Sequence, residues 1–268
     1  MASSMHCSFE PNKGSVKQRE GVSMLDFIGC GSAFNTPLGN NSAFIRRGKS
    51  LFLIDCGGSV FPRLQELGLL EDIENLYIAI THTHPDHVGS LGDLIFYSYY
   101  ILRKKPLVLF PEGELLAGLL SAIGVLSEMY CLECAKEERW QSQDIGNLEI
   151  VFHSVVHVDA IPAYGMVVRY NEGAFYYSGD AHEISPKVVA MLRAGEIKRV
   201  YHDTSGLDVA GNPHMSLIKL EHAFEPCLRD KVFCMHLDSY IRAPEVYSKG
   251  FQVVERYNFR QESRVKGR

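Results

Sequence analysis

Long apolar runs and a hydrophobic leader are both missing from this sequence. No apolar stretch approaches the roughly 20 residues needed to cross a lipid bilayer, so we expect no association with a membrane. The first 22 residues are polar and lack the apolar core of about 7–15 residues that a signal peptide needs. These absences predict a soluble protein that stays in the cytoplasm.

An excess of basic residues is also missing. Lys and Arg number 27 against 32 Asp and Glu, which gives a formal net charge of −5 at pH 7. Proteins that hold nucleic acids draw much of their affinity from Lys and Arg side chains that neutralise phosphates. The charge balance therefore argues against a stable nucleic acid partner.

Paired cysteines are scarce. The seven cysteines are an odd number, and Cys131 and Cys134 form the only close pair, with no second pair to complete a zinc-finger set. We predict that this pair lies in a helix and consists of two unreactive thiols. Such cysteine usage fits a reducing compartment and again favours the cytoplasm.

Strands and helices alternate along the chain, whose 268 residues and 46% apolar content allow a sizeable core. Residues 1–22 are expected to form a flexible N-terminal tail, and residues 23–268 a single domain without an internal linker. Apolar runs predict strands at residues 24–28, 43–46, 51–55, 76–81, 107–110, 148–157, 166–170, 174–178, 200–201 and 232–234. Helical spacing predicts helices at residues 61–70, 88–102, 114–129 and 217–224, and another that begins at Ser185-Pro186. This alternation predicts an α/β layered sandwich.

The most informative stretch is His82-Thr-His84-Pro-Asp86-His87. It follows the apolar run 76–81, so it lies on a loop that leaves a buried strand at the edge of a sheet. Such a loop can direct several side chains at one point that water still reaches. Imidazole and carboxylate together are the ligands that suit zinc and its first-row neighbours. We predict that this loop supplies ligands to two metal ions.

Further potential ligands follow strands in the second half of the chain. His157, Asp180 and His236 each come directly after an apolar strand-like run. A single histidine in such a place is more often a hydrogen-bonded structural residue, but three candidates in register with the first loop favour a shared metal site. Asp180 can bridge two cations because a carboxylate has two oxygens.

These motifs resemble the metallo-β-lactamase superfamily. Gly29-Cys-Gly-Ser32, Asp55-Cys-Gly57, the histidine loop, His157, Gly179-Asp180 and His236 match its motifs in order, over roughly residues 24–240. The resemblance implies a four-layer αββα sandwich and two divalent metal ions, with Zn²⁺ as the first choice and Mn²⁺ as the alternative. It assigns one metal to His82, His84 and His157, the other to Asp86, His87 and His236, and the bridge to Asp180. It also implies that Asp55 orients a ligand histidine.

Two further segments resemble the ribonuclease Z-like branch of this superfamily. His157 to Gly165 is similar to its His…Pro-x-x-Gly segment, and His202-Asp-Thr-Ser205 with the later His214 is similar to its His-Glu-Ala-Thr loop and extra histidine. By this resemblance His214 protonates a leaving oxygen and Asp203 orients it, although Asp reaches less far than the usual Glu. Asp86, His214 and Asp203 are therefore the catalytic candidates.

The short sequence separation between two of these proposed ligands narrows the range of possible substrates. Asp180 follows His157 after 23 positions, too few for the tRNA-binding arm that true ribonuclease Z enzymes commonly insert there. The compact layout resembles cyclic nucleotide phosphodiesterases of the anti-Pycsar type, and Gly31–Asn35 and Gly39–Ala43 are similar to that group. The resemblance implies a homodimer that hydrolyses 3′,5′-cyclic mononucleotides to 5′-monophosphates, with a hydroxide held by two metals and His214 as general acid.

Three alternatives remain open. The chain can be a ribonuclease Z-type tRNA 3′-processing endonuclease, a thioester hydrolase that shares the histidine loop, or a catalytically silent scaffold. Tyr97, Tyr99 and Tyr100 follow the metal loop on a predicted helix, where core and interface packing is favoured over stacking on a nucleobase. The preferred base, and the choice between immune evasion and ordinary signal turnover, are not determined by the sequence.

Overall fold

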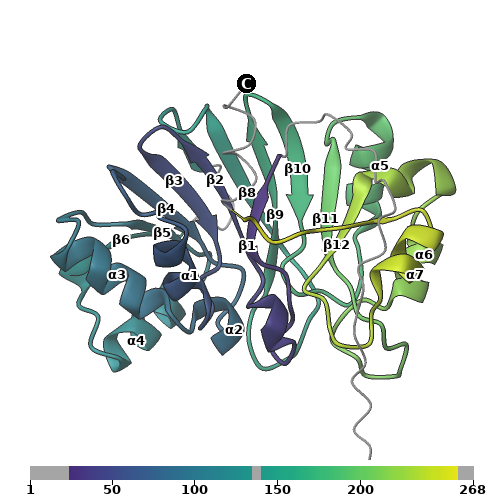
Figure 1. Cartoon of the computed structure of the whole chain (residues 1–268), viewed down its shortest axis with the longest axis horizontal. Helices are drawn as coiled ribbons and strands as arrows, with labels where there is room; N and C mark the ends of the chain where they lie inside the picture. The colour runs from purple at the N-terminus through teal and green to yellow at the C-terminus, as the bar shows by residue number, and fades with distance from the viewer. Residues whose placement is uncertain (1–23, 135–139, 259–268) are drawn as a thin grey trace, which may run out of the picture.

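Two β-sheets form the centre of the computed structural model, which describes residues 24–134 and 140–258 (Figure 1). The predicted N-terminal tail lies outside the described residues. In spatial order the first sheet contains β1 (Asp26–Gly29), β2 (Ser42–Arg47), β3 (Ser50–Ile54), β4 (Asn75–Ala79), β5 (Leu107–Leu109) and β6 (Cys131–Glu133). Strands β1 to β3 pair in antiparallel fashion, and β3 to β6 are parallel.

The second sheet follows a similar plan. In spatial order it contains β13 (Gln252–Val253), β12 (Val232–Met235), β11 (Arg199–Asp203), β10 (Gly173–Tyr177), β9 (Tyr164–Tyr170), β8 (Leu148–Ser154) and β7 (Trp140–Ser142). Strands β7 to β10 are antiparallel, whereas β10 to β13 are parallel. Each sheet therefore combines a hairpin part with a parallel part.

Helices cover the outer face of each sheet (Figure 1). The first sheet is covered by α1 (Val60–Glu66), α3 (Leu91–Tyr100) and α4 (Gly113–Ala122), and the second by α5 (Pro186–Ala194), α6 (Leu217–Ala223) and α7 (Ala243–Ser248). The short helix α2 (Pro85–Val88) lies at the lower edge, and the 3-10 helices are η1 (Thr36–Leu38), η2 (Ser127–Met129) and η3 (Pro226–Lys231). The four-layer αββα prediction is confirmed. None of the described helices has the length and apolar character needed to cross a bilayer.

Burial on both faces explains why the central strands read as unbroken apolar runs. All four residues of the run 51–54 in β3 are fully buried. One apolar cluster joins the inner faces of both sheets, and a second lies between the second sheet and its helices. Phe27 from the first sheet contacts Tyr201 from the second with ring centroids 5.5 Å apart. This packing fixes the strand ends that carry the candidate site.

Two predicted helices are wrong in part. Residues 131–133, which we expected in a helix with both thiols of the pair, form strand β6, because their backbone pairs with β5 along the parallel edge of the first sheet. The helix predicted at 114–129 ends at Ala122, and Gly124 adopts a positive φ of 83° that interrupts a helix. The helix predicted to begin at Ser185-Pro186 is confirmed as α5, with Ser185 as its N-cap: the Ser185 side chain accepts a hydrogen bond from the backbone N–H of Lys187.

Candidate metal centre and active site

The histidine loop begins where β4 ends. His84 is extended, with ψ of 150°, and Pro85 then occupies the first turn of α2, where its fixed φ suits a helix start. This turn places His82 and His84 before the helix and Asp86 and His87 within it. The loop therefore presents two side chains from the segment before α2 and two from α2 itself.

The segment after β3 packs directly against this helix, which explains the Asp-Cys-Gly motif. The backbone N–H of Cys56 donates to the carbonyl of His87 at 2.7 Å. A Cβ atom on Gly57 would lie 1.9 Å from the carbonyl oxygen of Asp86, so this position requires glycine. The motif therefore fixes α2 on the end of β3.

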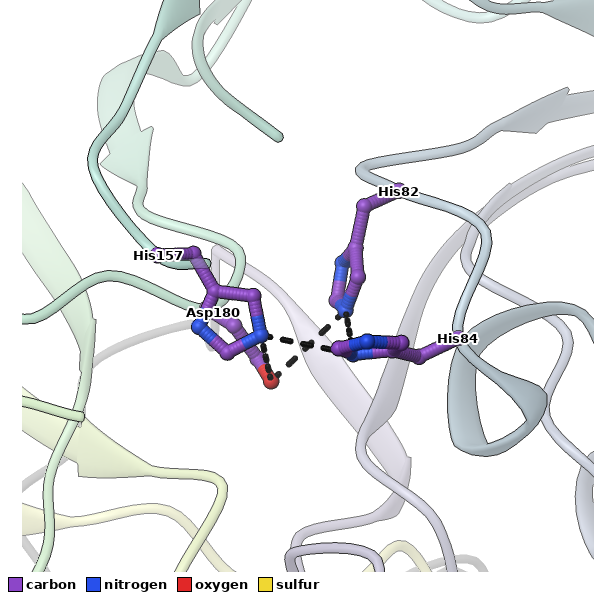
Figure 2. Close-up of side chains that lie close together, drawn as sticks. All are labelled: His82, His84, His157 and Asp180. Atoms are coloured by element: carbon purple, nitrogen blue, oxygen red, sulfur yellow. Dashed lines mark hydrogen bonds and ion pairs between the residues drawn. The ribbon is translucent and has the colours of Figure 1, made fainter. Parts of the chain in front are cut away.

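The first cluster brings together three histidines and one carboxylate (Figure 2). His82 Nε2 lies 3.1 Å from His84 Nδ1, and His157 Nε2 lies 3.3 Å from the same nitrogen. Asp180 Oδ2 lies 3.8 Å from His82 Nε2 and 3.7 Å from His157 Nε2. In Figure 2 the three rings point their nitrogens toward one another and toward this oxygen.

The second cluster contains Asp86, His87 and His236, and it shares Asp180 with the first. Asp86 Oδ2 lies 3.4 Å from His87 Nε2 and 3.2 Å from His236 Nε2. Asp180 Oδ1 lies 3.2 Å from His87 Nε2, and its Oδ2 lies 3.4 Å from His236 Nε2. All seven side chains predicted as ligands therefore converge, with Asp180 between the two groups.

The spacing of these atoms fits divalent cations. Zinc binds imidazole nitrogen at about 2.0–2.1 Å in a tetrahedron, which places neighbouring ligand nitrogens about 3.3–3.4 Å apart. The histidine pairs of the first cluster, at 3.1 and 3.3 Å, are close to that spacing. His87 Nε2 and Asp180 Oδ1 lie 3.2 Å apart but are not aligned for a hydrogen bond, and both are buried without another partner among the described residues, which is costly unless a further atom bonds to them.

Burial and charge prepare the two clusters differently. Burial lowers the pKa of His82 well below its ordinary value and also lowers that of His157, so both rings keep a lone pair for a metal. Burial also opposes protonation of His236, but the carboxylates of Asp180 and Asp203 raise its pKa to about 10. Burial alone would raise the pKa of Asp180, yet His236 and His87 hold it well below its usual range. The bridging carboxylate is therefore ionised and attracts positive charge.

Asp55 holds the orientation of one histidine. It is fully buried, and its Oδ2 accepts hydrogen bonds from His87 Nδ1 at 2.8 Å and from Thr81 Oγ1 at 2.9 Å. Its Oδ1 accepts the backbone N–H of Thr81 at 2.8 Å. Because Nδ1 is engaged in this way, His87 turns its Nε2 toward the second cluster. This geometry matches the orienting role expected for Asp55.

A residue that the sequence analysis did not single out supports His236. This histidine has a positive φ of 54°, a conformation that is uncommon outside glycine. The buried Asn41 accepts the backbone N–H of His236 at 3.2 Å and donates to the Tyr177 hydroxyl at 2.8 Å. The only signal in the sequence was the position of Asn41 within the glycine- and asparagine-rich turn 39–43.

His214 and Asp203 lie together beside the second cluster. His214 Nδ1 donates to Asp203 Oδ2 at 2.6 Å and lies 3.9 Å from Asp180 Oδ2. Asp203 Oδ1 lies 3.3 Å from His236 Nδ1, although the two are not aligned for a hydrogen bond. Burial would lower the pKa of His214, but Asp203 raises it above its ordinary value. The pair therefore favours an imidazole that carries a proton.

A second residue absent from the sequence analysis organises the loop that carries His214. Asp238 accepts hydrogen bonds from Ser205 Oγ at 2.5 Å and from the backbone N–H groups of Gly206 and Tyr240. Because Asp238 lies two residues after His236, it ties the loop that starts at Ser205 to the second cluster. Its proximity to a ligand in the sequence did not distinguish it from an ordinary surface acid.

Both clusters open into one cavity of about 630 Å³. This volume suits a small molecule. The described residues that line it are Ala33, Phe34, Thr36, Asn40, Gly58, His84, Pro85, Asp86, His157, Val158, Asp180, Pro213, His214 and His236. The tyrosines of α3 are not among them, because Tyr97 and Tyr99 pack against the core and Tyr100 is exposed. His153 and His182 also lie outside this lining.

The layers and the site define the chain as a metallo-β-lactamase-fold protein with His and Asp clusters suited to divalent metals. The crystal structure of the metallo-β-lactamase fold protein YhfI from Bacillus subtilis matches it with a TM-score of 0.68 at 14% sequence identity. That match covers 88% of this chain and 97% of the other. At this identity the similarity shows the fold.

The chain belongs to the Anti-Pycsar protein Apyc1 family, whose model matches residues 23–259. It is 28% identical over 207 residues to the Anti-Pycsar protein Apyc1 of Paenibacillus sp. (strain J14), covering 73% of this chain and 82% of that protein. It is 29% identical over 233 residues to the protein of the same name from Bacillus phage 010DV004, covering 79% and 88%. The resemblance predicted from the motifs is confirmed at the level of the family.

Exchange of Asp55 for asparagine tests the support of the second cluster. We expect Asp55→Asn to weaken zinc or manganese binding by about 10- to 100-fold, because an amide has only one acceptor oxygen. If that oxygen accepts from His87 Nδ1 and Thr81 Oγ1, the amide NH₂ faces the backbone N–H of Thr81. Titration against a competing chelator measures this affinity. Asp72→Asn is the matched control, since Asp72 is exposed and also has a positive φ. Equal affinities in all three proteins would contradict the orienting role.

Proposed function

We propose that this protein is a metal-dependent phosphodiesterase that hydrolyses 3′,5′-cyclic mononucleotides to 5′-monophosphates. The observation that carries the proposal is the His214–Asp203 pair, held at 2.6 Å beside the shared carboxylate Asp180. An alkoxide that leaves phosphorus needs a proton, and an imidazole can supply it near neutral pH. A thiolate leaves without such help, so the pair favours a phosphodiester over a thioester.

The proposed ligands form two sets around a bridge. His82, His84 and His157 hold one cation, Asp86, His87 and His236 hold the other, and Asp180 bridges. When bound, two divalent cations supply an activated water and neutralise charge on the phosphate oxygens. Zinc is the first choice and manganese the second, since imidazole and carboxylate accept both.

The chain's own residues then position the general acid and protonate the leaving oxygen of the substrate. Asp203 holds the Nδ1 proton of His214, which leaves Nε2 as the nitrogen available to a substrate in the cavity. His214 donates the proton on Nε2 to the departing 3′-oxygen. Asp86 lines the same cavity and contacts His236. We therefore count Asp86 among the catalytic residues, where it holds the second cluster in place beside the substrate.

The connection between β9 and β10 favours a small substrate. These strands are joined by Asn171 and Glu172 alone, so no tRNA-binding arm leaves the fold at this place. The cavity of about 630 Å³ accommodates a mononucleotide. Membership of the anti-Pycsar family, with relatives in bacteria and phages, supports the same substrate class. Immune evasion and ordinary signal turnover both remain compatible with this activity.

The proposal is tested by purified protein loaded with zinc or manganese. We expect turnover of purine or pyrimidine 3′,5′-cyclic monophosphates to the 5′-monophosphate, and no cleavage of a tRNA precursor or of a glutathione thioester. Precursor cleavage without cyclic nucleotide turnover would establish the ribonuclease Z alternative. Thioester turnover alone would establish the second alternative, and a protein that binds no metal would be a scaffold.

Removal of the proposed acid separates catalysis from metal binding. We expect His214→Ala to lower turnover by on the order of 10²-fold or more, the scale of lost general acid catalysis, while metal content stays the same. Turnover and metal content by elemental analysis are measured on the same preparation. His182→Ala is the control, because this half-buried histidine lies outside the cavity lining. Loss of metal in His214→Ala would make His214 a ligand instead.

A second copy of the chain is the partner that we propose. Exposed apolar side chains occur at the end of α3, along α4 and just after it, and Ile123 lies against Gly92 of α3. They are Tyr100, Ile101, Leu115, Leu119, Ile123 and Leu126. Light scattering is expected to give twice the mass of 30.1 kDa, and Ile123→Glu to give a monomer. Val209→Glu, an exposed apolar position elsewhere, should leave the dimer intact, and a monomeric parent protein would contradict the proposal.

The cytoplasm is the compartment that we propose for this activity. The six cysteines in the described part of the chain are all free, and three of them are exposed. Exposed free thiols persist in a reducing compartment. A cyclic nucleotide substrate in the cytoplasm is consistent with this location.

A further inference from the structure

Phe34 is the most exposed large apolar side chain in the described part of the protein, with 96% of its surface accessible. It also lines the cavity that contains both metal-ligand clusters. Leaving a phenylalanine in water forgoes about 1.5–3 kcal/mol of burial free energy. A ring left in water beside a reaction centre is therefore available to a ligand.

The loop that carries Phe34 is held firmly. The backbone N–H of Asn35 donates to the Ser32 carbonyl at 3.0 Å and closes a tight turn with Phe34 near its tip. Ser32 N–H and Asn35 Nδ2 both donate to the Leu237 carbonyl, at 3.0 and 2.9 Å, directly after the ligand His236. The backbone that carries the ring is thus fixed relative to the second cluster, so only the side chain of Phe34 loses conformational freedom on binding.

The chemistry of the remaining lining indicates what this ring contacts. Phe34 is the only aromatic side chain other than histidine among the described residues of the cavity wall. Outside the proposed ligands and His214, the only polar side chains there are those of Thr36 and Asn40, which are uncharged. Asn40 Oδ1 already accepts the backbone N–H of Ser59 at 2.8 Å. The wall therefore offers a flat apolar face and few groups that could read hydrogen-bonding edges.

We propose that Phe34 is the stacking platform for the nucleobase of the substrate. This inference rests on the proposed phosphodiesterase function and adds the determinant of base binding. With the phosphate at the clusters, the base extends toward the cavity mouth and lies on the Phe34 ring. Every base presents a π face, so stacking binds all of them with little discrimination. The only preference that we expect from stacking is a modest one for purines, which offer the larger face.

A series of substitutions at Phe34 tests the platform. Loss of one base–aromatic stack costs about 1–3 kcal/mol, so Phe34→Ala should raise KM for cyclic nucleotides by roughly 5- to 150-fold while kcat changes much less. Phe34→Tyr retains a ring and should remain close to the parent. Phe34→Leu keeps an apolar side chain of similar size and should lose most of the affinity. Phe34 is exposed, so thermal unfolding should be unchanged in all three.

A ribose 3′,5′-cyclic phosphate without a base is the matched substrate. Phe34→Ala and the parent should hydrolyse it with the same KM, because there is no base to stack. An unchanged KM for cyclic nucleotides in Phe34→Ala would overturn the stacking role of Phe34 but not the proposed phosphodiesterase function. A change of mass in light scattering without a change of KM would also overturn the stacking role, because Phe34 would then be a contact between protein chains. Absence of cyclic nucleotide turnover in the parent would instead overturn the proposed function, and the platform with it.

Discussion

The buried carboxylate of Asp180 is the group on which the site depends. Its two oxygens face histidines of both clusters, and only 2% of the residue is accessible to water. An ionised carboxylate removed from water is destabilising by several kcal/mol unless positive charge or hydrogen bonds compensate. His87 and His236 provide part of that compensation and keep the pKa of the carboxyl low. Divalent cations held by the proposed ligands would provide the rest.

The fold brings these ligands together from distant parts of the chain. His82 to His87 follow β4, Asp180 follows β10 and His236 follows β12, and these strand ends meet near α2 at the lower edge of both sheets (Figure 1). The strands are held by the apolar cluster between the sheets, which cannot shift without losing packing. A further layer of hydrogen bonds then fixes the rings: Asp55 holds His87, and Asn41 holds the backbone of His236. Precision at the site therefore derives from the core and from these buried acceptors.

Much of the fold, and the convergence of the candidate ligands, could be predicted because local patterns specify them. A buried strand gives an apolar run, and a candidate ligand shortly after such a run lies at the common edge of the sheet, as His157 and Asp180 do. Strand β6 was missed because its identity depends on pairing with β5, whereas its own residues carry no strand pattern. Asn41, Asp238 and the exposure of Phe34 were missed for a related reason: each is defined by a partner far away in sequence or by the absence of one. Such features appear only once distant segments are placed in space.

Anomalous diffraction from crystals grown with zinc, recorded above and below the zinc absorption edge, is the most direct test of the two-cluster site. Two anomalous peaks are expected, one in contact with His82, His84 and His157 and the other with Asp86, His87 and His236, with Asp180 touching both. A fully zinc-loaded crystal with no peak at these side chains, or with the rings turned away from one another, would contradict the proposed centre and the chemistry built on it.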